Sequence, residues 1–243
     1  MSDEKTVSRR DLLGLSLGMS GLAGSSLLAQ AQPAASAGSA YPKDRTALLI
    51  VDPYNDFMSE GGKLYAQTLE TAKEVGFYDN MRKLVPAVRA SEIRVFIVPH
   101  HRAAKGDYDG WLAVTSSQRG AGRTMLFEAG TWGGDWHPEF GPKPGDVVIK
   151  EHWAQSGFAN TDLDQQLKQH GIQKVILVGF IANTCVESTG RFAMELGYHV
   201  TMVKDATAAF SKEGLTAAQV NAPTYAHAIV TTSDLIAALP KRG

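Results

Sequence analysis

Short apolar runs alternate with segments of helical spacing along most of the chain. Apolar residues recur at intervals of three and four positions over 69–90, 162–170, 185–196 and 216–228, which predicts helices. Gly197 is placed to end the third of them, the fourth is expected to break or kink near Pro223, and Ser233 is placed to cap a last helix. Apolar runs between them predict strands at 46–51, 94–98, 146–150, 174–180, 198–204 and 229–232. Strands that alternate with helices are typical of a parallel sheet covered on both faces. We therefore predict an α/β fold, a single three-layer αβα domain on a mostly parallel six-stranded sheet.

The first residues follow a different pattern from the rest. A twin-arginine pair, Arg9 and Arg10, precedes a weakly apolar stretch that ends at the small residues around Ala31. This order predicts a twin-arginine signal peptide over 1–31, a linker over 32–43 and a folded domain over 44–243. Cleavage after Ala31 is favoured over cleavage after Ala37. A transmembrane anchor is the alternative, but glycine and serine make the stretch a poor one.

Export by this route carries folded proteins, so we expect a periplasmic or secreted protein with no membrane attachment after cleavage. The single cysteine cannot form an internal disulfide, so the domain must be stable through its core alone. The formal net charge is −1, and no block of basic residues is present. Nucleic acid is therefore not an expected partner.

Four chemically useful residues come at or just after the ends of predicted strands: Asp52, His100, Lys150 and Cys185. Ligands bind beyond the carboxyl ends of the strands in such sheets, so we expect these side chains to face one site. Cys185 is predicted in the first turn of a helix, with Thr184 as its N-cap, where free N–H groups favour a thiolate. A small buried hydrophobic residue is the alternative interpretation of a lone cysteine.

Other candidates lie in and around the long Gly- and Trp-rich segment 100–145. The pair His100 and His101 could bind a metal, but neighbouring residues on a strand point to opposite faces, so no metal site is predicted. The tryptophans at 111, 132, 136 and 153 either line a pocket or pack a loop or a subunit interface, and the sequence leaves both open.

Three motifs resemble those of the isochorismatase-like cysteine hydrolases, a family that includes nicotinamidases and related small-amide hydrolases. The first is the run from Asp52 to Phe57, which reads Asp-Pro-Tyr-Asn-Asp-Phe. The second is Lys150 followed by Ser156-Gly157-Phe158, and the third is the Gly179–Val186 segment around Cys185. The resemblance spans roughly 46–239 and implies a Rossmann-like, isochorismatase-like fold.

The resemblance also implies roles for particular residues. It implies a catalytic triad of Cys185, Asp52 and Lys150, and a non-proline cis peptide between Ile181 and Ala182. In the family this bond turns backbone N–H groups, here those of Ala182 and Cys185, toward the oxyanion of the reaction. Side chains expected to line the substrate pocket are Phe57, His100, Trp153 and Phe158.

Two departures from the family narrow the expected activity. The Asp-x-His metal motif of nicotinamidases is missing at 99–102, which argues against a metal and against that branch, and Tyr54 replaces a usual glutamine. Siderophore-type isochorismatases lack the cysteine that this chain has. We therefore expect a cofactor-free homo-oligomeric hydrolase that cleaves a C–N bond of a small amide or ureide through a thioester. A vinyl-ether hydrolase and a thiol redox protein are the alternatives.

Overall fold

The computed structural model describes residues 39–241. The predicted signal peptide, 1–31, and residues 32–38 of the predicted linker lie outside the described residues, as do residues 242–243. Among the residues that are described, no helix has both the length and the apolar character needed to cross a membrane.

Six strands form one sheet in the order β3-β2-β1-β4-β5-β6. They are β1 (Thr46–Val51), β2 (Arg94–Val98), β3 (Val147–Val148), β4 (Lys174–Phe180), β5 (His199–Ala208) and β6 (Ala228–Val230). Every neighbouring pair is parallel. The predicted α/β class is therefore confirmed, and the sheet is more regular than expected because all its pairs, rather than most, are parallel.

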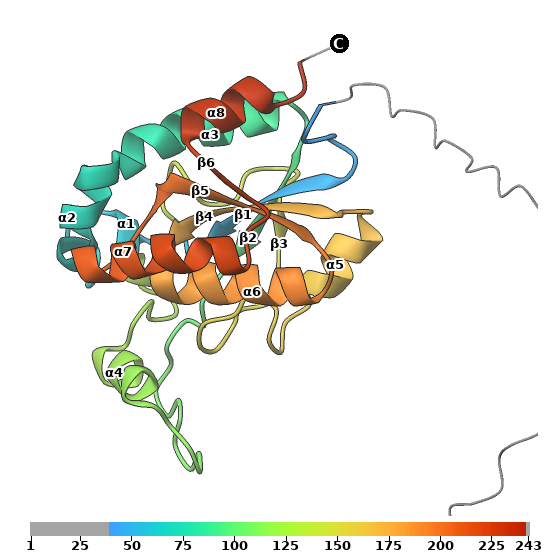
Figure 1. Ribbon diagram of the computed structural model, residues 1–243. Coiled ribbons are helices and arrows are strands. Elements are labelled where there is room, and N and C mark those ends of the chain that lie inside the picture. Colours follow the sequence, from blue (N-terminus) through green and yellow to red (C-terminus); the bar gives the residue numbers. More distant parts are fainter. Residues whose placement is uncertain (1–38, 242–243) are drawn as a thin grey trace, which may run out of the picture. The chain divides into compact units, whose positions relative to one another are not determined.

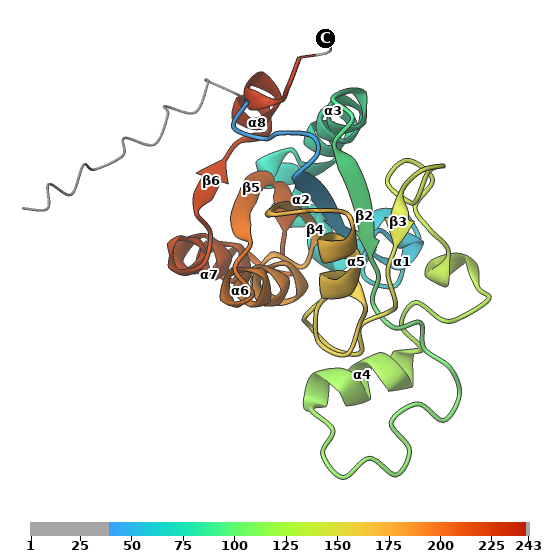
Figure 2. The same cartoon turned by 90° about the vertical axis from the view of Figure 1, so that its right-hand side faces the viewer.

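Helices cover both faces of the sheet (Figures 1 and 2). On one face lie α2 (Tyr65–Val75), α3 (Phe77–Ala90) and α8 (Thr232–Ala238), and on the other α5 (Leu163–Gln169), α6 (Glu187–Glu195) and α7 (Lys212–Asn221). Both faces of the central strands are thus shielded from water, which is why β1 is apolar almost throughout and fully buried. The three predicted layers are confirmed.

Several predicted boundaries were wrong for local reasons. The helix predicted over 69–90 is two helices, because Gly76 takes a left-handed conformation with φ of 70° and ends α2 before α3 begins. The helix predicted over 216–228 stops at Asn221 and passes into a 3₁₀ turn, Ala222–Thr224, that contains Pro223, so the predicted break near this proline is confirmed, whereas the predicted end at 228 was wrong. Gly197 does follow the end of α6 with φ of 89°, as predicted.

The third strand is much shorter than the predicted 146–150. Only Val147 and Val148 pair regularly with β2, yet the chain stays beside β2 beyond them. The N–H of Ile149 donates to the carbonyl of Ile97, and an isolated bridge joins His152 to His100. This irregular extension carries the chain past the carboxyl end of β2 and into the rim of the sheet.

The segment between β2 and β3 forms an arm that carries α4 (Ser116–Thr124) and stands away from the sheet (Figures 1 and 2). The short helix α1 (Asn55–Met58) holds the base of this segment. The Asn55 amide donates to the carbonyl of Trp132, and the buried Asp56 carboxylate accepts from the backbone N–H groups of Phe127 and Lys63. Two residues of the first motif therefore position the arm.

Candidate active site

Asp52 follows β1 directly and lies at the carboxyl edge of the sheet. Its side chain is fully buried, and its backbone adopts a left-handed conformation with φ of 55°, which aspartate tolerates better than most residues. Its N–H donates to the carbonyl of Val98 on β2. The chain leaves β1 between β2 and β4, at the point where successive connections run in opposite directions along the sheet.

Cys185 follows β4, the neighbour of β1 on the other side. The turn after the strand is a single π-helical turn, labelled η2 (Ala182–Val186), that runs into α6. The N–H groups of Thr184 and Val186 both donate to the carbonyl of Ile181. Thr184 is therefore inside the turn, and the prediction that it is an N-cap was wrong because the helical turn starts earlier, at Ala182.

A non-proline cis peptide is present in this segment, one residue before the predicted place. It joins Phe180 to Ile181, so the prediction of a cis bond between Ile181 and Ala182 was wrong. The bond falls at the junction of β4 and the turn, because β4 keeps its pairing with β5 as far as Phe180. Ala182 is fully buried in the turn that carries Cys185.

The third member of the cluster is His152, and it was not predicted. Its Nε2–H donates to Asp52 Oδ1 over 3.1 Å, and both side chains are completely buried. Lys150, which the resemblance implied, is exposed, and its backbone N–H donates to Asp162 Oδ1. The prediction of Lys150 was wrong because the chain beyond β3 turns the side chain of residue 152, rather than that of 150, into the rim.

A signal for His152 was present in the sequence. It lies nearer to the Ser156-Gly157-Phe158 motif than Lys150 does, and a histidine just before that motif is a candidate for general acid–base chemistry. What the sequence could not show was the backbone path. The backbone N–H of His152 donates to the carbonyl of Pro99, and this hydrogen bond fixes the backbone path. The two residues are 53 positions apart in the chain, 152 − 99.

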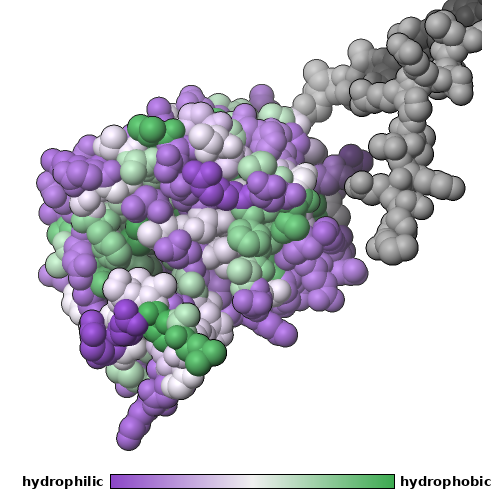
Figure 3. Space-filling model, turned by 60° about the horizontal axis from the view of Figure 1, so that its bottom comes forward, coloured by the Kyte–Doolittle hydropathy of each residue, from purple (hydrophilic) through white to green (hydrophobic). Residues whose placement is uncertain are grey.

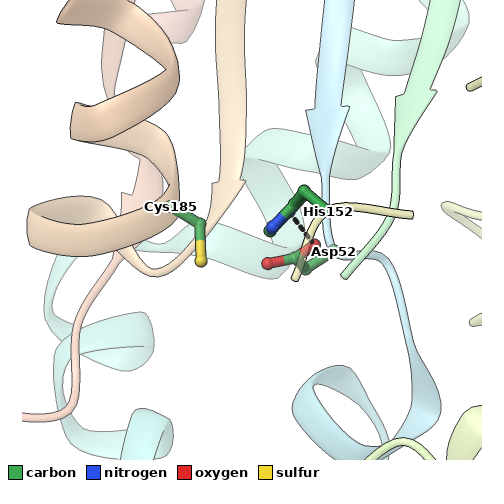
Figure 4. Close-up of side chains that lie close together, drawn as sticks. All are labelled: Asp52, His152 and Cys185. Carbon is green, nitrogen blue, oxygen red and sulfur yellow. Dashed lines mark hydrogen bonds and ion pairs between the residues drawn. The ribbon is translucent and has the colours of Figure 1, made fainter. Parts of the chain in front are cut away.

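Asp52, His152 and Cys185 converge at one point (Figure 4). One ligand-type atom from each lies within 4.8 Å of the others. The Asp52 carboxylate and the His152 ring nitrogen are directed toward the Cys185 sulfur in this view. Asp52 Oδ2 and His152 Nδ1 are buried and have no hydrogen-bond partner among the described residues. The cluster thus holds an acceptor oxygen that is free to take a proton.

The surroundings of Cys185 favour its protonated thiol over the thiolate. Burial raises its pKa well above the usual value, and the Asp52 carboxylate raises it further, while the Thr184 hydroxyl and the backbone of Ile181 act weakly in the opposite sense. A nearby carboxylate disfavours a second negative charge, so the proton stays on sulfur until a substrate changes the site. Burial also lowers the pKa of His100, which keeps that imidazole neutral.

Cys185 opens onto a pocket of about 300 Å³ between the sheet rim and the arm. Two predicted pocket residues, Phe57 and His100, line it, and so does α4 through Ser117, Ala121 and Thr124. The face with the arm carries hydrophobic residues among polar ones (Figure 3). The lining among the described residues contains no lysine, arginine, aspartate or glutamate.

Trp153 lines the adjoining hollow together with His100 and stacks on His101 at 3.6 Å between ring centroids. Phe158, by contrast, is buried behind the site and packs against Tyr198, so its prediction as a pocket residue was wrong. The chain turns at Gly157, where a Cβ would lie 2.4 Å from the side chain of Val98, and this close approach directs Phe158 into the core.

Of the other tryptophans, Trp111 packs against Trp153 at 5.4 Å between ring centroids. Trp136 stacks on Tyr54 at 4.9 Å, and the Arg102 guanidinium lies over both rings. The Tyr54 hydroxyl donates to the carbonyl of His100. Trp111 and Trp132 are about half exposed. Tyr54, which departs from the family pattern, therefore supports the wall of the pocket behind His100.

Asp52, His152 and Cys185 are also the donor set in the described chain that could hold a metal ion. His100 and His101 do not form a pair of ligands. His100 Nδ1–H donates to the carbonyl of His101, whereas His101 pairs through Nε2 with Asp107. The two side chains therefore have different hydrogen-bond partners.

Comparison with known proteins gives consistent similarities. A family model for the Isochorismatase domain matches residues 46–234. The chain is 30% identical over 172 residues to ureidoacrylate amidohydrolase RutB of Rhizobium rhizogenes, covering 67% of this chain and 70% of that protein. It is 32% identical over 178 residues to the protein of the same name from Yersinia enterocolitica, covering 69% and 77%.

Solved structures share the same architecture. N-carbamoylsarcosine amidase from Thermoplasma acidophilum superposes with a TM-score of 0.61 at 30% identity, covering 77% of this chain and 96% of that one. A cysteine hydrolase from Pseudomonas syringae pv. phaseolicola gives a TM-score of 0.66 at 22% identity and covers 85% and 98%, a likeness that concerns the fold.

Proposed function

This chain belongs to the isochorismatase family, and we propose that it is a thiol-dependent hydrolase that cleaves the C–N bond of a small, uncharged amide or ureide. The family resemblance drawn from the motifs is confirmed, and the relatives support a hydrolase acting on small amides or ureides. The observation that carries the mechanistic proposal is the cluster of Asp52, His152 and Cys185, in which Cys185 lines the pocket.

In the proposed reaction, Asp52 Oδ2 takes the proton from Cys185 Sγ as the thiolate attacks the carbonyl carbon. The carbonyl electron pair moves onto oxygen, and the backbone N–H groups of Ile181 and Cys185, two residues after β4 that line the pocket, donate to that oxyanion. Asp52 then returns the proton to the departing nitrogen, the C–N bond breaks and a thioester remains. Water, deprotonated by Asp52, hydrolyses the thioester and releases Cys185.

His152 has a positioning role in this scheme. Its Nε2–H donates to Asp52 Oδ1, which leaves Oδ2 without a partner and free to accept the thiol proton. The raised pKa of the Cys185 thiol supports concerted rather than prior deprotonation, since a free thiolate beside a buried carboxylate is disfavoured. His152 thus takes the place in the triad that was expected for Lys150.

The pocket lining supports an uncharged substrate. Ureidoacrylate carries a carboxylate, and a buried carboxylate requires a cationic partner. No lysine or arginine lines the pocket among the described residues, and the neighbouring Asp52 would repel an anion. We therefore assign to this chain the C–N bond chemistry of its amidohydrolase relatives on a neutral small molecule rather than on their named substrates.

The test is a panel of small neutral amides and ureides, each paired with a carboxylate analogue, with ammonia release as the readout. Wild-type protein is expected to release ammonia, whereas Cys185→Ala and Cys185→Ser are expected to lose at least about a thousandfold in kcat/KM with the fold intact. Mass spectrometry of protein quenched with a slow substrate should reveal an acyl adduct on Cys185. Unchanged turnover in Cys185→Ala would exclude the covalent mechanism.

Two further activities are tested in the same panel. Hydrolysis of vinyl ethers without release of ammonia would favour the isochorismatase-type reaction. Peroxide consumption that depends on Cys185 would favour a thiol redox protein, although this chain has no second cysteine to resolve a sulfenic acid.

We also propose export of the protein by the twin-arginine route. The Arg9–Arg10 pair and the apolar stretch behind it support the proposal. Fractionation of cells that express the full chain should place it in the periplasm or medium, and Arg9→Lys combined with Arg10→Lys should retain it in the cytoplasm. An unchanged distribution in the double variant would contradict the proposal. The expected homo-oligomer stays a prediction, measurable by light scattering.

A further inference from the structure

We propose that Asp52, His152 and Cys185 also form a binding site for Zn²⁺ and that zinc bound there blocks hydrolysis. The binding part stands by itself. The inhibitory part rests on the proposed function, because it requires Cys185 and Asp52 to be the reacting groups.

The chemistry of the three side chains fits this ion. Thiolate, imidazole and carboxylate are the common zinc ligands in proteins, and three of them with one open position form a typical accessible site. Ions that prefer oxygen ligands alone, such as Mg²⁺, do not suit a site with a thiolate and an imidazole. The site should therefore bind Zn²⁺ more tightly than Mg²⁺, because two of its three donors are sulfur and nitrogen.

The distances are close to those that zinc requires. With bonds of about 2.0–2.3 Å, tetrahedral ligand atoms lie about 3.3–3.8 Å from one another. Here one donor atom from each residue lies within 4.8 Å of the others, and His152 Nε2 is 3.1 Å from Asp52 Oδ1. Side-chain adjustments of about 1 Å or less would place all three around one ion.

A second, independent observation points to a ligand. Asp52 Oδ2 and His152 Nδ1 have no hydrogen-bond partner among the described residues, although both side chains are completely buried. Buried polar atoms are normally satisfied, so the carboxylate oxygen Asp52 Oδ2 is left with unused coordination capacity, and the unpartnered Nδ1 leaves the His152 ring free to change tautomer. Cys185 adds a third donor from the wall of the pocket, through which an ion can enter.

The charge balance favours binding in this buried place. When zinc binds, the Sγ–H bond breaks, the proton leaves to solvent and the sulfur lone pair forms the Zn–S bond. The neutral His152 ring binds through Nε2, so its proton moves from Nε2 to the unpartnered Nδ1 by exchange with solvent. The thiolate and the Asp52 carboxylate then carry two negative charges, and a neutral His152 adds none. These charges offset those of Zn²⁺, so the occupied site is neutral and its burial is not opposed by an unpaired charge.

Occupation of the site removes the reacting groups. The thiolate lone pair is shared with the metal, and the carboxylate that should accept the thiol proton is coordinated. A lysine at position 152 would prevent this binding, because an ammonium group has no lone pair and repels the cation. His152→Lys should therefore lose zinc binding, whether or not it hydrolyses the substrate.

The experiment uses the purified chain without an affinity tag, treated first with a chelator. Zinc binding is measured by calorimetry, protection of Cys185 by the rate of iodoacetamide alkylation, and thiolate ligation by the charge-transfer absorption of the Co²⁺ form. We expect one zinc ion per chain, bound with micromolar or tighter affinity. Alkylation of Cys185 should be at least about tenfold slower with zinc, because the coordinated sulfur is less available to the reagent.

Cys185→Ser, Asp52→Asn, His152→Gln and His152→Lys should each weaken binding by at least about 100-fold. His199→Gln is the matched control, because His199 and His227 stack at 4.8 Å outside the site and offer a rival histidine pair. It should leave zinc affinity unchanged. Circular dichroism tests whether each variant is folded. If the Cys185 variant does not fold, the spectrum of the Co²⁺ form of the wild-type chain still tests whether the thiolate is a ligand.

Three results would overturn the proposal: no binding at micromolar zinc, binding that survives the Cys185 and His152 changes, or a cobalt spectrum without a thiolate band. Failure of the proposed function looks different. If zinc binds at these residues but activates hydrolysis, the site stands and the covalent mechanism fails. If zinc does not bind while Cys185 still forms an acyl adduct, the mechanism stands and the zinc site fails.

Discussion

At the scale of single residues, His152 determines how the Asp52 carboxylate is oriented in the site. A histidine that donates to one oxygen of a buried carboxylate orients it and leaves the other oxygen free. Lys150 lies only two positions earlier, yet it is on the solvent side. The two residues therefore offer a direct comparison.

We expect His152→Ala to lower kcat/KM by about 10²–10⁴-fold, because Asp52 loses its orienting donor. Lys150→Ala should remain within about threefold of wild type, since exposed side chains away from the site have small effects. Steady-state rates of ammonia release measure both. The opposite ranking of the two variants would restore Lys150 to the triad.

Gly179 is a second residue with a specific requirement. It lies next to Val51 in the central pair of strands with φ of 111°, and a Cβ there would meet the carbonyl oxygen of Val51 at 2.2 Å. We expect Gly179→Ala to lower the free energy of unfolding by about 3 kcal/mol or more, since strain and overlap with backbone add.

Gly197→Ala is the matched control for this prediction. Its φ is 89°, but a Cβ would meet nothing within 4 Å, so only the backbone cost of about 1–2 kcal/mol is expected. Denaturant unfolding of both variants measures the difference. Equal losses would show that crowding at Val51 is unimportant.

At the scale of elements, α4 shapes the pocket although it is remote from the sheet. Thr115 caps α4 in a capping box with Gln118, and residues of α4 line the pocket at Cys185. Thr115→Ala should destabilise this helix by about 1 kcal/mol. Because α4 forms part of the pocket wall, we expect KM to rise by about fivefold with kcat little changed.

Thr231 provides the control, because it caps α8 in the same kind of capping box, with Asp234, and follows the edge strand β6. Thr231→Ala should lower the melting temperature while KM stays at the wild-type value. If Thr115→Ala likewise leaves KM unchanged, α4 does not contribute to substrate binding.

At the scale of the whole molecule, histidines outside the site link stability to pH. Burial lowers the pKa of His137, and burial, Lys174 and His227 lower that of His199. The N–H of Glu139 donates to His137 Nδ1, a bond that requires an unprotonated nitrogen. When the pKa of a histidine is lower in the folded chain than in the unfolded chain, the unfolded chain takes up the proton first as the pH decreases. The free energy of unfolding therefore decreases as the pH is lowered.

The contribution of these histidines is therefore fully present above their ordinary pKa of about 6.5 and is lost as the pH falls below it. His101 acts in the opposite sense: burial lowers its pKa, but Glu151 and Asp107 outweigh this and raise it. The test therefore compares the loss of stability on acidification between a variant and the wild-type chain. Unfolding at about pH 7.5 and 5.5 should show a smaller acid loss in His137→Asn than in wild type. Equal losses would contradict the assignment.

The sequence by itself determined the layers and the rim. Apolar runs long enough to be buried on both faces predicted the strands, and the resulting parallel sheet brought Asp52 and Cys185 to neighbouring strand ends. These properties depend on local periodicity and on the direction of the strands, so they can be read without coordinates. Phe57 and His100, which were expected to line a substrate pocket, do line the pocket beside Cys185, because each follows a strand at that rim.

The tertiary structure alone decided which side chains turn inward where regular structure ends. His152 replaces Lys150, and Phe158 enters the core instead of the pocket. Beyond the two residues of β3 there is no repeating period, and the orientation of each side chain is set by pairing with β2 and by the close approach of Gly157 to Val98. Such contacts join positions far apart in the chain, and they also place α4 over the pocket, so local propensity does not encode them.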